Sequence, residues 1–176
     1  MEKTLKSIAS NYGLYLGALL ALLTVIAYAV NLNLFVNFWF GLSIYLLIIV
    51  IGIIAVAKVK QNFNGYATFK DAFTAYFITI LIGLSISTAV SFVLFNFIDT
   101  EAAVVLKEKS IDKMVSVYEN NNLPQDKLAE IVEKMESEDL YSLKNNLTAL
   151  AINYLLPLSI IGLLVAAAMK KTNPNS

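Results

Sequence analysis

Long apolar runs without any charged residue dominate the pattern of hydrophobic and polar positions along the chain. Four of these runs cover residues 12–30, 34–56, 72–98 and 147–169. An α-helix needs roughly 20 apolar residues to cross about 30 Å of hydrocarbon, and each run is close to that length or longer. Because a backbone in lipid must satisfy its hydrogen bonds within its own segment, the runs predict four transmembrane helices.

The one sizeable polar stretch, residues 99–144, separates the third run from the fourth. Each half carries apolar residues at helical spacing, with three consecutive asparagines between the halves, and this pattern predicts a helical hairpin. The predicted fold class is therefore all-α, a single polytopic membrane domain of residues 1–176 with the hairpin inserted between spans three and four. We expect the apolar stripes to pack on each other, to lie on the membrane or to bind a partner. The candidate partner-binding residues are Val104, Ile111, Val115, Tyr118, Leu128, Ile131 and Met135.

Composition agrees with a membrane protein and excludes much catalytic chemistry. Hydrophobic residues make up 58% of the chain and charged residues 15%, with a mean hydropathy of +0.68. A soluble domain of this size could not hide so much apolar surface from water. The chain has no histidine and no cysteine, which excludes disulfides, thiolate nucleophiles, Cys/His zinc sites and histidine acid–base catalysis. The net charge is zero, so we expect no attraction to nucleic acid, and no cofactor is predicted.

The placement of lysines predicts the orientation in the membrane. Seven lysines lie before span one, between spans two and three, and after span four, where only two carboxylates accompany them. Residues 99–144 instead hold six lysines and eleven carboxylates. The positive-inside rule then predicts cytoplasmic termini and an outward-facing acidic hairpin. The seven lysines are Lys3, Lys6, Lys58, Lys60, Lys70, Lys170 and Lys171.

The first run has a second interpretation as a signal peptide, because Ala27-Tyr28-Ala29 resembles a cleavage site. A second span begins only a few residues later, so we expect an uncleaved helix. In span four, Pro157 removes a helical hydrogen bond, which predicts a kink with an inward-facing Asn153. Before span three, Thr68 and Asp71 have the spacing of a capping box.

Small residues spaced by four along spans one and three predict how these two helices pack. A face without bulky side chains allows two backbones to approach closely, and the two spans are parallel in the predicted topology. The alternative is that the hydroxyls of Thr79, Ser87 and Ser91 line a polar path. The helix-packing residues are Gly13, Gly17, Ala21, Ala75, Thr79, Gly83, Ser87 and Ser91.

The segment that starts at Gly65 and ends at Phe73, GYATFKDAF, resembles a motif of a known family. This is an uncharacterised domain-of-unknown-function family (number 4199) of small four-span inner-membrane proteins of Gram-negative bacteria. The two opening spans, the long third span, the acidic hairpin and the final span are also similar. The resemblance implies an inner-membrane location, a periplasmic hairpin and a partnership with a membrane glycosyltransferase. It implies no established activity and no catalytic residues.

Two functions follow from these patterns. Charge-free spans, small-residue faces and an amphipathic hairpin favour a non-enzymatic accessory or scaffold subunit of a membrane assembly, in contact with the bilayer and a protein partner. The alternative is a small transporter, channel or lipid-handling protein for a neutral or lipid substrate. Intramembrane ionisable residues mark ion-coupled pathways, and the spans contain none. An enzyme is the third hypothesis, but no acid–base pair stands out.

Overall fold

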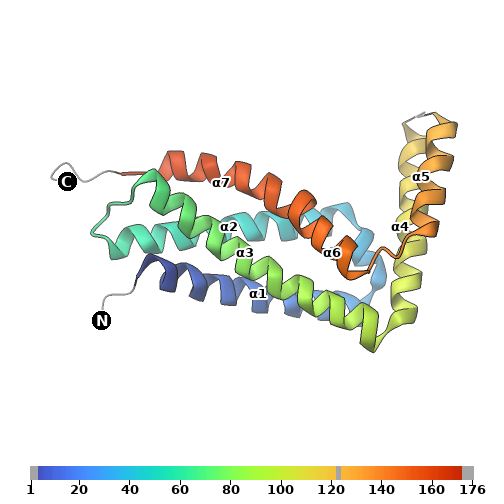
Figure 1. Cartoon of the computed structure of the whole chain (residues 1–176), viewed down its shortest axis with the longest axis horizontal. Helices are drawn as coiled ribbons and strands as arrows, with labels where there is room; N and C mark the ends of the chain where they lie inside the picture. Colours follow the sequence, from blue (N-terminus) through green and yellow to red (C-terminus); the bar gives the residue numbers. More distant parts are fainter. Residues whose placement is uncertain (1–3, 122–123, 172–176) are drawn as a thin grey trace.

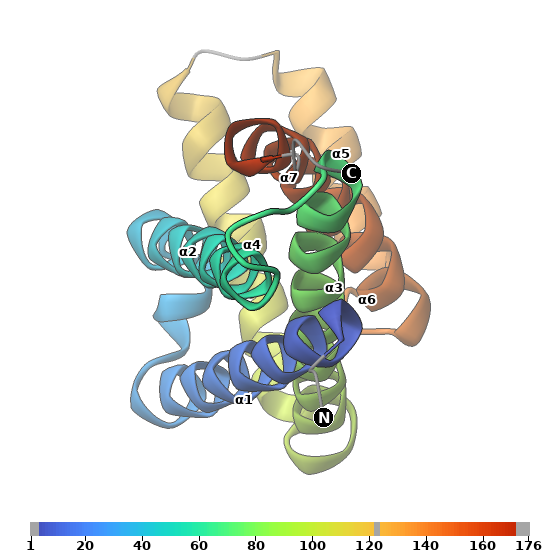
Figure 2. The same ribbon diagram turned by 90° about the vertical axis from the view of Figure 1, so that its left-hand side faces the viewer.

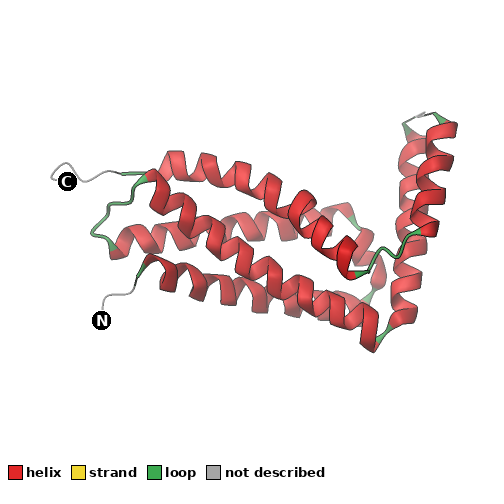
Figure 3. Cartoon of the chain, in the orientation of Figure 1, coloured by secondary structure: helices red, strands yellow, loops and turns green. Residues whose placement is uncertain are grey.

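The computed structural model describes residues 4–121 and 124–171, which are almost entirely helical and contain no β-strand. Four helices are long and apolar enough to cross a membrane, and they lie side by side as one bundle (Figures 1 and 3). The predicted all-α polytopic fold with four spans and an inserted hairpin is therefore confirmed. The four candidate spans are Leu5–Val30, Phe38–Asn62, Phe69–Ile98 and Leu143–Met169.

The connection between the first two spans is built by asparagines. Helix α1 (Leu5–Val30) leads into a short 3-10 helix, η1 (Leu32–Val36), and then into α2 (Phe38–Asn62). The side chain of Asn31 accepts from a backbone N–H of η1, and that of Asn37 accepts from one of α2. These caps satisfy N–H groups that helix starts leave free. Consequently α2 begins at Phe38, directly after its cap Asn37, and not at residue 34, the predicted start of this span.

A tight turn and a capping box connect α2 to α3 (Phe69–Val93). Gly65 has a φ of 85°, a left-handed conformation that glycine adopts without strain. The Thr68 side chain accepts from the Asp71 N–H at 3.1 Å, and the Asp71 carboxylate accepts from the Thr68 N–H at 3.0 Å. The predicted capping box is confirmed.

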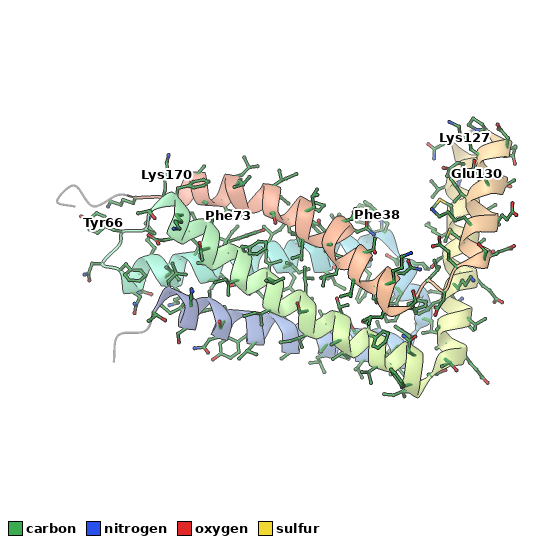
Figure 4. All side chains as sticks on the ribbon, viewed as in Figure 1. Phe38, Tyr66, Phe73, Lys127, Glu130 and Lys170 are labelled. Atoms are coloured by element: carbon green, nitrogen blue, oxygen red, sulfur yellow. The ribbon has the colours of Figure 1, made fainter. Side chains whose placement is uncertain are left out.

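The same connection is tied to the end of the chain's last helix. Ala67 and Lys171 exchange two backbone hydrogen bonds of 2.9 and 2.8 Å. The Nζ atom of Lys171 lies 5.4 Å from the centre of the Tyr66 ring, and Lys60 donates to the Met169 carbonyl. Residues of the GYATFKDAF segment thus fasten one end of the bundle. We call this the terminus end, and Figure 4 shows Tyr66 there.

The opposite end, the hairpin end, carries two amphipathic helices. Span three finishes in a π-helix, η2 (Leu94–Ile98), followed by α4 (Thr100–Asn120) and α5 (Gln125–Ser137). Asn122, part of the predicted break, lies outside the described residues. The α4–α5 pair lies across the bundle axis, and its far part extends beyond the edge formed by α7 (Figures 1 and 2).

Span four is not a uniform helix. It consists of α6 (Leu143–Ala149), a π-helix η3 (Leu150–Leu155) and α7 (Leu156–Met169). Pro157 has no N–H and cannot bond the carbonyl four residues back, so the π-helix shifts the preceding hydrogen bonds to partners five residues back. Asn153 is exposed on this segment, so the expectation that it faces inward is wrong.

Candidate functional site

Glycines of α1 allow α3 to approach closely in the half of the bundle near the terminus end. A Cβ atom added to Gly13 would lie 2.8 Å from the Ile82 Cβ, and one added to Gly17 would lie 2.6 Å from the Ile86 Cδ1. Real Cβ atoms do not approach neighbours this closely, so a larger residue would push the helices apart. The predicted packing stripe of α1 therefore lies against α3 at these two positions.

The stripe on α3 makes the reciprocal contact. Gly83 receives the Leu16 side chain, whose Cδ2 would lie 2.5 Å from an added Cβ. Thr79 is fully buried, and its hydroxyl lies 3.1 Å from the Ala9 carbonyl and 2.8 Å from the Ala75 carbonyl. Because one of these carbonyls belongs to α1, the hydroxyl connects the two helices and is satisfied inside the interface.

Towards the hairpin end, the same two stripes behave differently. Ala21, Ser87 and Ser91 are only half-buried, in contrast to the buried Ala75. Both serines line a cavity. The stripe therefore divides into a packed part and a cavity wall, with Thr79 in the first and the two serines in the second.

This cavity has a volume of about 360 Å³ and lies among all four spans. The volume falls within the range typical of small-molecule sites, about 300–1,000 Å³. None of the lining side chains is charged, although many carry a hydroxyl or an amide. The lining residues are Leu20, Thr24, Phe35, Phe40, Gly41, Ile44, Tyr45, Ile48, Leu84, Ser87, Thr88, Ser91, Phe95, Leu140, Tyr141, Asn145, Asn146, Ala149, Leu150 and Tyr154.

The backbones of α2 and span four diverge at this level. In the described part of the chain, the backbone of α2 approaches α7 closely but neither η3 nor α6. Side chains still meet between them, since the rings of Tyr45 and Tyr154 stack with their centres 6.4 Å apart. The cavity is therefore lined on one side by two helices that move apart.

A loop closes the cavity at the hairpin end. The Tyr141 carbonyl accepts hydrogen bonds from the side-chain amides of Asn96 at 2.9 Å and Asn146 at 2.7 Å. The Tyr141 ring lies 5.0 Å from the Phe95 ring, centre to centre. Burial raises the pKa of the Tyr141 hydroxyl to about 12, so it stays neutral at physiological pH.

Asp99 fixes the direction in which the hairpin leaves the bundle. One carboxylate oxygen accepts from the Ala102 N–H at 2.9 Å and caps α4, while the other accepts from the Tyr28 hydroxyl of α1 at 2.7 Å. These bonds, the Ala102 N–H first and the Tyr28 hydroxyl second, lower the pKa of Asp99 below its usual range. An aspartate between an apolar run and an amphipathic helix signals a cap, but its partner Tyr28 follows only from the fold.

An apolar base and a lysine complete the attachment of the hairpin. Ala102 and Leu106 are buried against the end of span three, near Leu94 and Phe95. The Lys107 ammonium donates to the carbonyls of Glu136 and Glu138, which joins α4 to the last turn of α5 and to the residue that caps it. The sequence pattern missed Ala102 and Leu106 because it followed a stripe that begins at Val104.

The predicted partner-binding residues are distributed unequally between the inside and the outside of the hairpin. Val104 is 58% exposed, and it lines a shallow hollow beside the base. Leu128 is buried, and since α5 contacts α4 alone among the described elements, α4 must cover it. The remaining predicted residues are half-buried: Ile111, Val115, Tyr118, Ile131 and Met135.

Acidic side chains are abundant on the hairpin but do not converge. Within residues 4–121 and 124–171, no group of three or more acidic residues could hold a metal ion. The cavity and the hairpin are therefore the two features that the geometry offers for a function.

Comparison with known proteins gives one match. A family model described as "Protein of unknown function (DUF4199)" matches residues 11–171, a range that includes the hairpin and nearly all of the four candidate spans. No curated protein and no solved structure matches the chain.

Proposed function

The chain belongs to this family of proteins of unknown function (DUF4199), and from that premise we propose that it is a non-enzymatic accessory subunit of a membrane assembly. The hairpin is the element that binds the partner protein. What supports this proposal is that, among the described elements, α5 contacts only α4, so the outer part of the hairpin adds nothing to the packing of the bundle. Ordering a segment costs about 1–2 kcal/mol of backbone entropy per residue, and a partner surface would offset that cost.

The shape of the hairpin suits a partner beside the bundle. Helix α4 has 21 residues and is therefore about 30 Å long, comparable to the thickness of a bilayer's hydrocarbon core. Since it lies across the bundle axis and passes the edge at α7, it would reach over a neighbouring membrane protein (Figures 1 and 2). Val105 and Val117 are exposed along it and would be covered by such a neighbour.

The charge of the hairpin favours a protein over the lipid surface. Residues 99–144 contain six lysines and eleven carboxylates, a net charge of −5. Anionic lipids repel such a segment, whereas a basic face on a partner attracts it. Glu130 lies on the outside of α5 (Figure 4). A membrane glycosyltransferase is the partner that the family resemblance suggests.

We place the protein in the bacterial inner membrane, with the terminus end in the cytoplasm and the hairpin in the periplasm. Lys60 and Lys171 make contacts at the terminus end, and Lys58 and Lys70 lie close to that connection in the sequence. Figure 4 shows Lys170 at the same end, opposite the hairpin. The positive-inside rule favours this orientation. Lys3, which counts towards the same argument, lies outside the described residues.

Cross-linking and affinity purification from native membranes in mild detergent test the proposal. Replacing residues 104–135 with a flexible linker should abolish partner recovery while the four spans still insert. A sharper variant changes Glu130 and Glu133 to glutamine, and its matched control changes Lys127 and Lys134 of the same helix to glutamine. Partner recovery should fall only in the glutamate variant. Full recovery after the replacement of residues 104–135 would reject the hairpin as the docking element.

A further inference from the structure

We infer that the cavity among the four spans binds one uncharged membrane lipid, a long hydrocarbon chain that ends in a hydroxyl or an ester. The inference stands apart from the accessory role, because it rests on the cavity and not on the hairpin. Its first support is the lining, in which none of the twenty residues is charged. A phosphate or ammonium headgroup placed there would lack an ionic partner, and burying an unpaired charge is costly.

Polarity changes along the depth of the cavity in the way that such a lipid requires. Leu20, Ile48 and Leu84 are buried apolar residues at the deep end, towards the middle of the bundle. Side-chain amides of Asn145 and Asn146 lie at the end nearest the hairpin. A hydrocarbon chain therefore meets hydrocarbon, and its polar end lies close to the level where a bilayer meets water.

Three hydroxyls between these levels are available to a ligand. Ser87, Thr88 and Ser91 line the cavity from α3, and their side chains make no hydrogen bond within residues 4–121 and 124–171. Thr24, across the cavity on α1, instead donates to the Leu20 carbonyl one turn back. A hydroxyl or ester group on the ligand can accept from the three free donors, which a purely hydrocarbon ligand cannot do.

The route of entry also selects a lipid. The backbones of α2 and of the η3–α6 part of span four diverge beside the cavity, with the Tyr45–Tyr154 pair between them. Both π-helical segments contribute to the wall, Phe95 from η2 and Leu150 from η3. Such segments are common at functional sites because they redirect side chains out of the regular helical pattern. A ligand dissolved in the membrane would enter between these two diverging helices without crossing water.

Photolabelling of the reconstituted full-length protein tests the inference. The probe is a diacylglycerol with a diazirine in one acyl chain, present at low mole fraction in phosphatidylcholine vesicles, and labelled peptides are mapped by mass spectrometry. The double variant Ser87→Leu/Ser91→Leu fills the cavity and should reduce labelling of cavity peptides about tenfold. Its control is Ser85→Leu, an exposed position of the same helix outside the lining, which should leave labelling unchanged.

A second cavity-filling variant keeps the test valid if the double variant fails to fold. Gly41 lines the cavity, and a Cβ atom there would meet nothing within 4 Å, so Gly41→Leu should fold normally and also lower the labelling. Excess unlabelled diacylglycerol should compete with the probe, and phosphatidylglycerol, which is anionic, should not. The inference would be overturned if the exposed α7 positions Ile160 and Leu164 were labelled as strongly as the cavity peptides. It would also be overturned if neither cavity-filling variant reduced the labelling of the cavity peptides. Equal competition by phosphatidylglycerol would refute the preference for an uncharged lipid.

Discussion

Tyr76 of α3 is held between two glycines, and this contact makes a sharp prediction about the bundle. Its side chain is 1% exposed. A Cβ atom on Gly162 of α7 would lie 2.5 Å from the Cδ1 of the ring, and one on Gly52 of α2 would lie 2.6 Å from its Cε2. The ring is therefore blocked on both sides and cannot move away from a methyl group introduced on either.

These distances set the expected loss in the free energy of unfolding for Gly162→Ala. Overpacking a helix interface costs about 1–3 kcal/mol, and the blocked ring places Gly162→Ala at the upper end. Alanine gives back about 1 kcal/mol through its helix propensity, which leaves a net loss of about 2 kcal/mol in the free energy of unfolding. Gly41→Ala is the matched control, because its Cβ meets nothing within 4 Å. That variant should be unchanged or slightly more stable.

Equilibrium unfolding in mixed micelles, followed by far-UV circular dichroism, measures both variants. The ring is identified as the cause by a double-mutant cycle with Tyr76→Leu. Because leucine leaves room for the new methyl group, and the gain in helix propensity is the same in both backgrounds, Tyr76→Leu should cost about 3 kcal/mol less in the Gly162→Ala background than in the wild type. Equal unfolding midpoints for Gly162→Ala and Gly41→Ala, or a cycle without coupling, would refute the reasoning.

Three further predictions concern other parts of the molecule. Thr79→Val removes the hydroxyl that connects α3 to α1 and should cost about 0.6–1.7 kcal/mol in the same unfolding assay. Thr74→Val should cost less, because Thr74 is half-buried and its side chain makes no hydrogen bond to any described residue. The lowered pKa of Asp99 means that its carboxylate stabilises the hairpin base above about pH 3.8, and that this contribution disappears as the pH falls through the lowered value. The protection of amide hydrogens in the first turn of α4, taken relative to their intrinsic exchange rates at each pH, should therefore fall with acid in the wild type. An Asp99→Asn variant should show no such step. Single cysteines at Asn64 and Ser116 of this cysteine-free chain should react with a membrane-impermeant maleimide from opposite sides, and labelling of both from the same side would contradict the proposed orientation.

The spans, the hairpin and the capping box could be predicted because each depends on local chemistry. A charge-free run of about 20 residues has few alternatives to a membrane helix, and the Thr68–Asp71 pair is defined by its spacing. The small-residue stripes were visible for the same reason, and Gly13 and Gly17 indeed face α3.

Which face of each span meets protein could not be predicted so readily. In a membrane both the lipid-facing and the buried faces are apolar, so periodicity carries little information about burial. Tyr76 stands in an apolar run with nothing to mark it, and its two glycine partners lie in other helices. Asn153 shows the opposite error, because its polarity suggested burial and the π-helical segment turns it outward. The cavity depends on the divergence of α2 from span four, which is a property of the whole bundle.

The two ends of the bundle differ in a way that links the cavity to the hairpin. At the terminus end, the two Ala67–Lys171 backbone bonds and the packed glycines hold the spans together. At the hairpin end, Phe95 and Tyr141 belong both to the cavity lining and to the apolar base beneath α4. A lipid in the proposed site would contact these two rings, and the proposed partner, acting on the hairpin, would act partly through them. We therefore expect the two binding events to be coupled, and any such coupling is reciprocal, so lipid occupancy and partner affinity should change each other by the same factor.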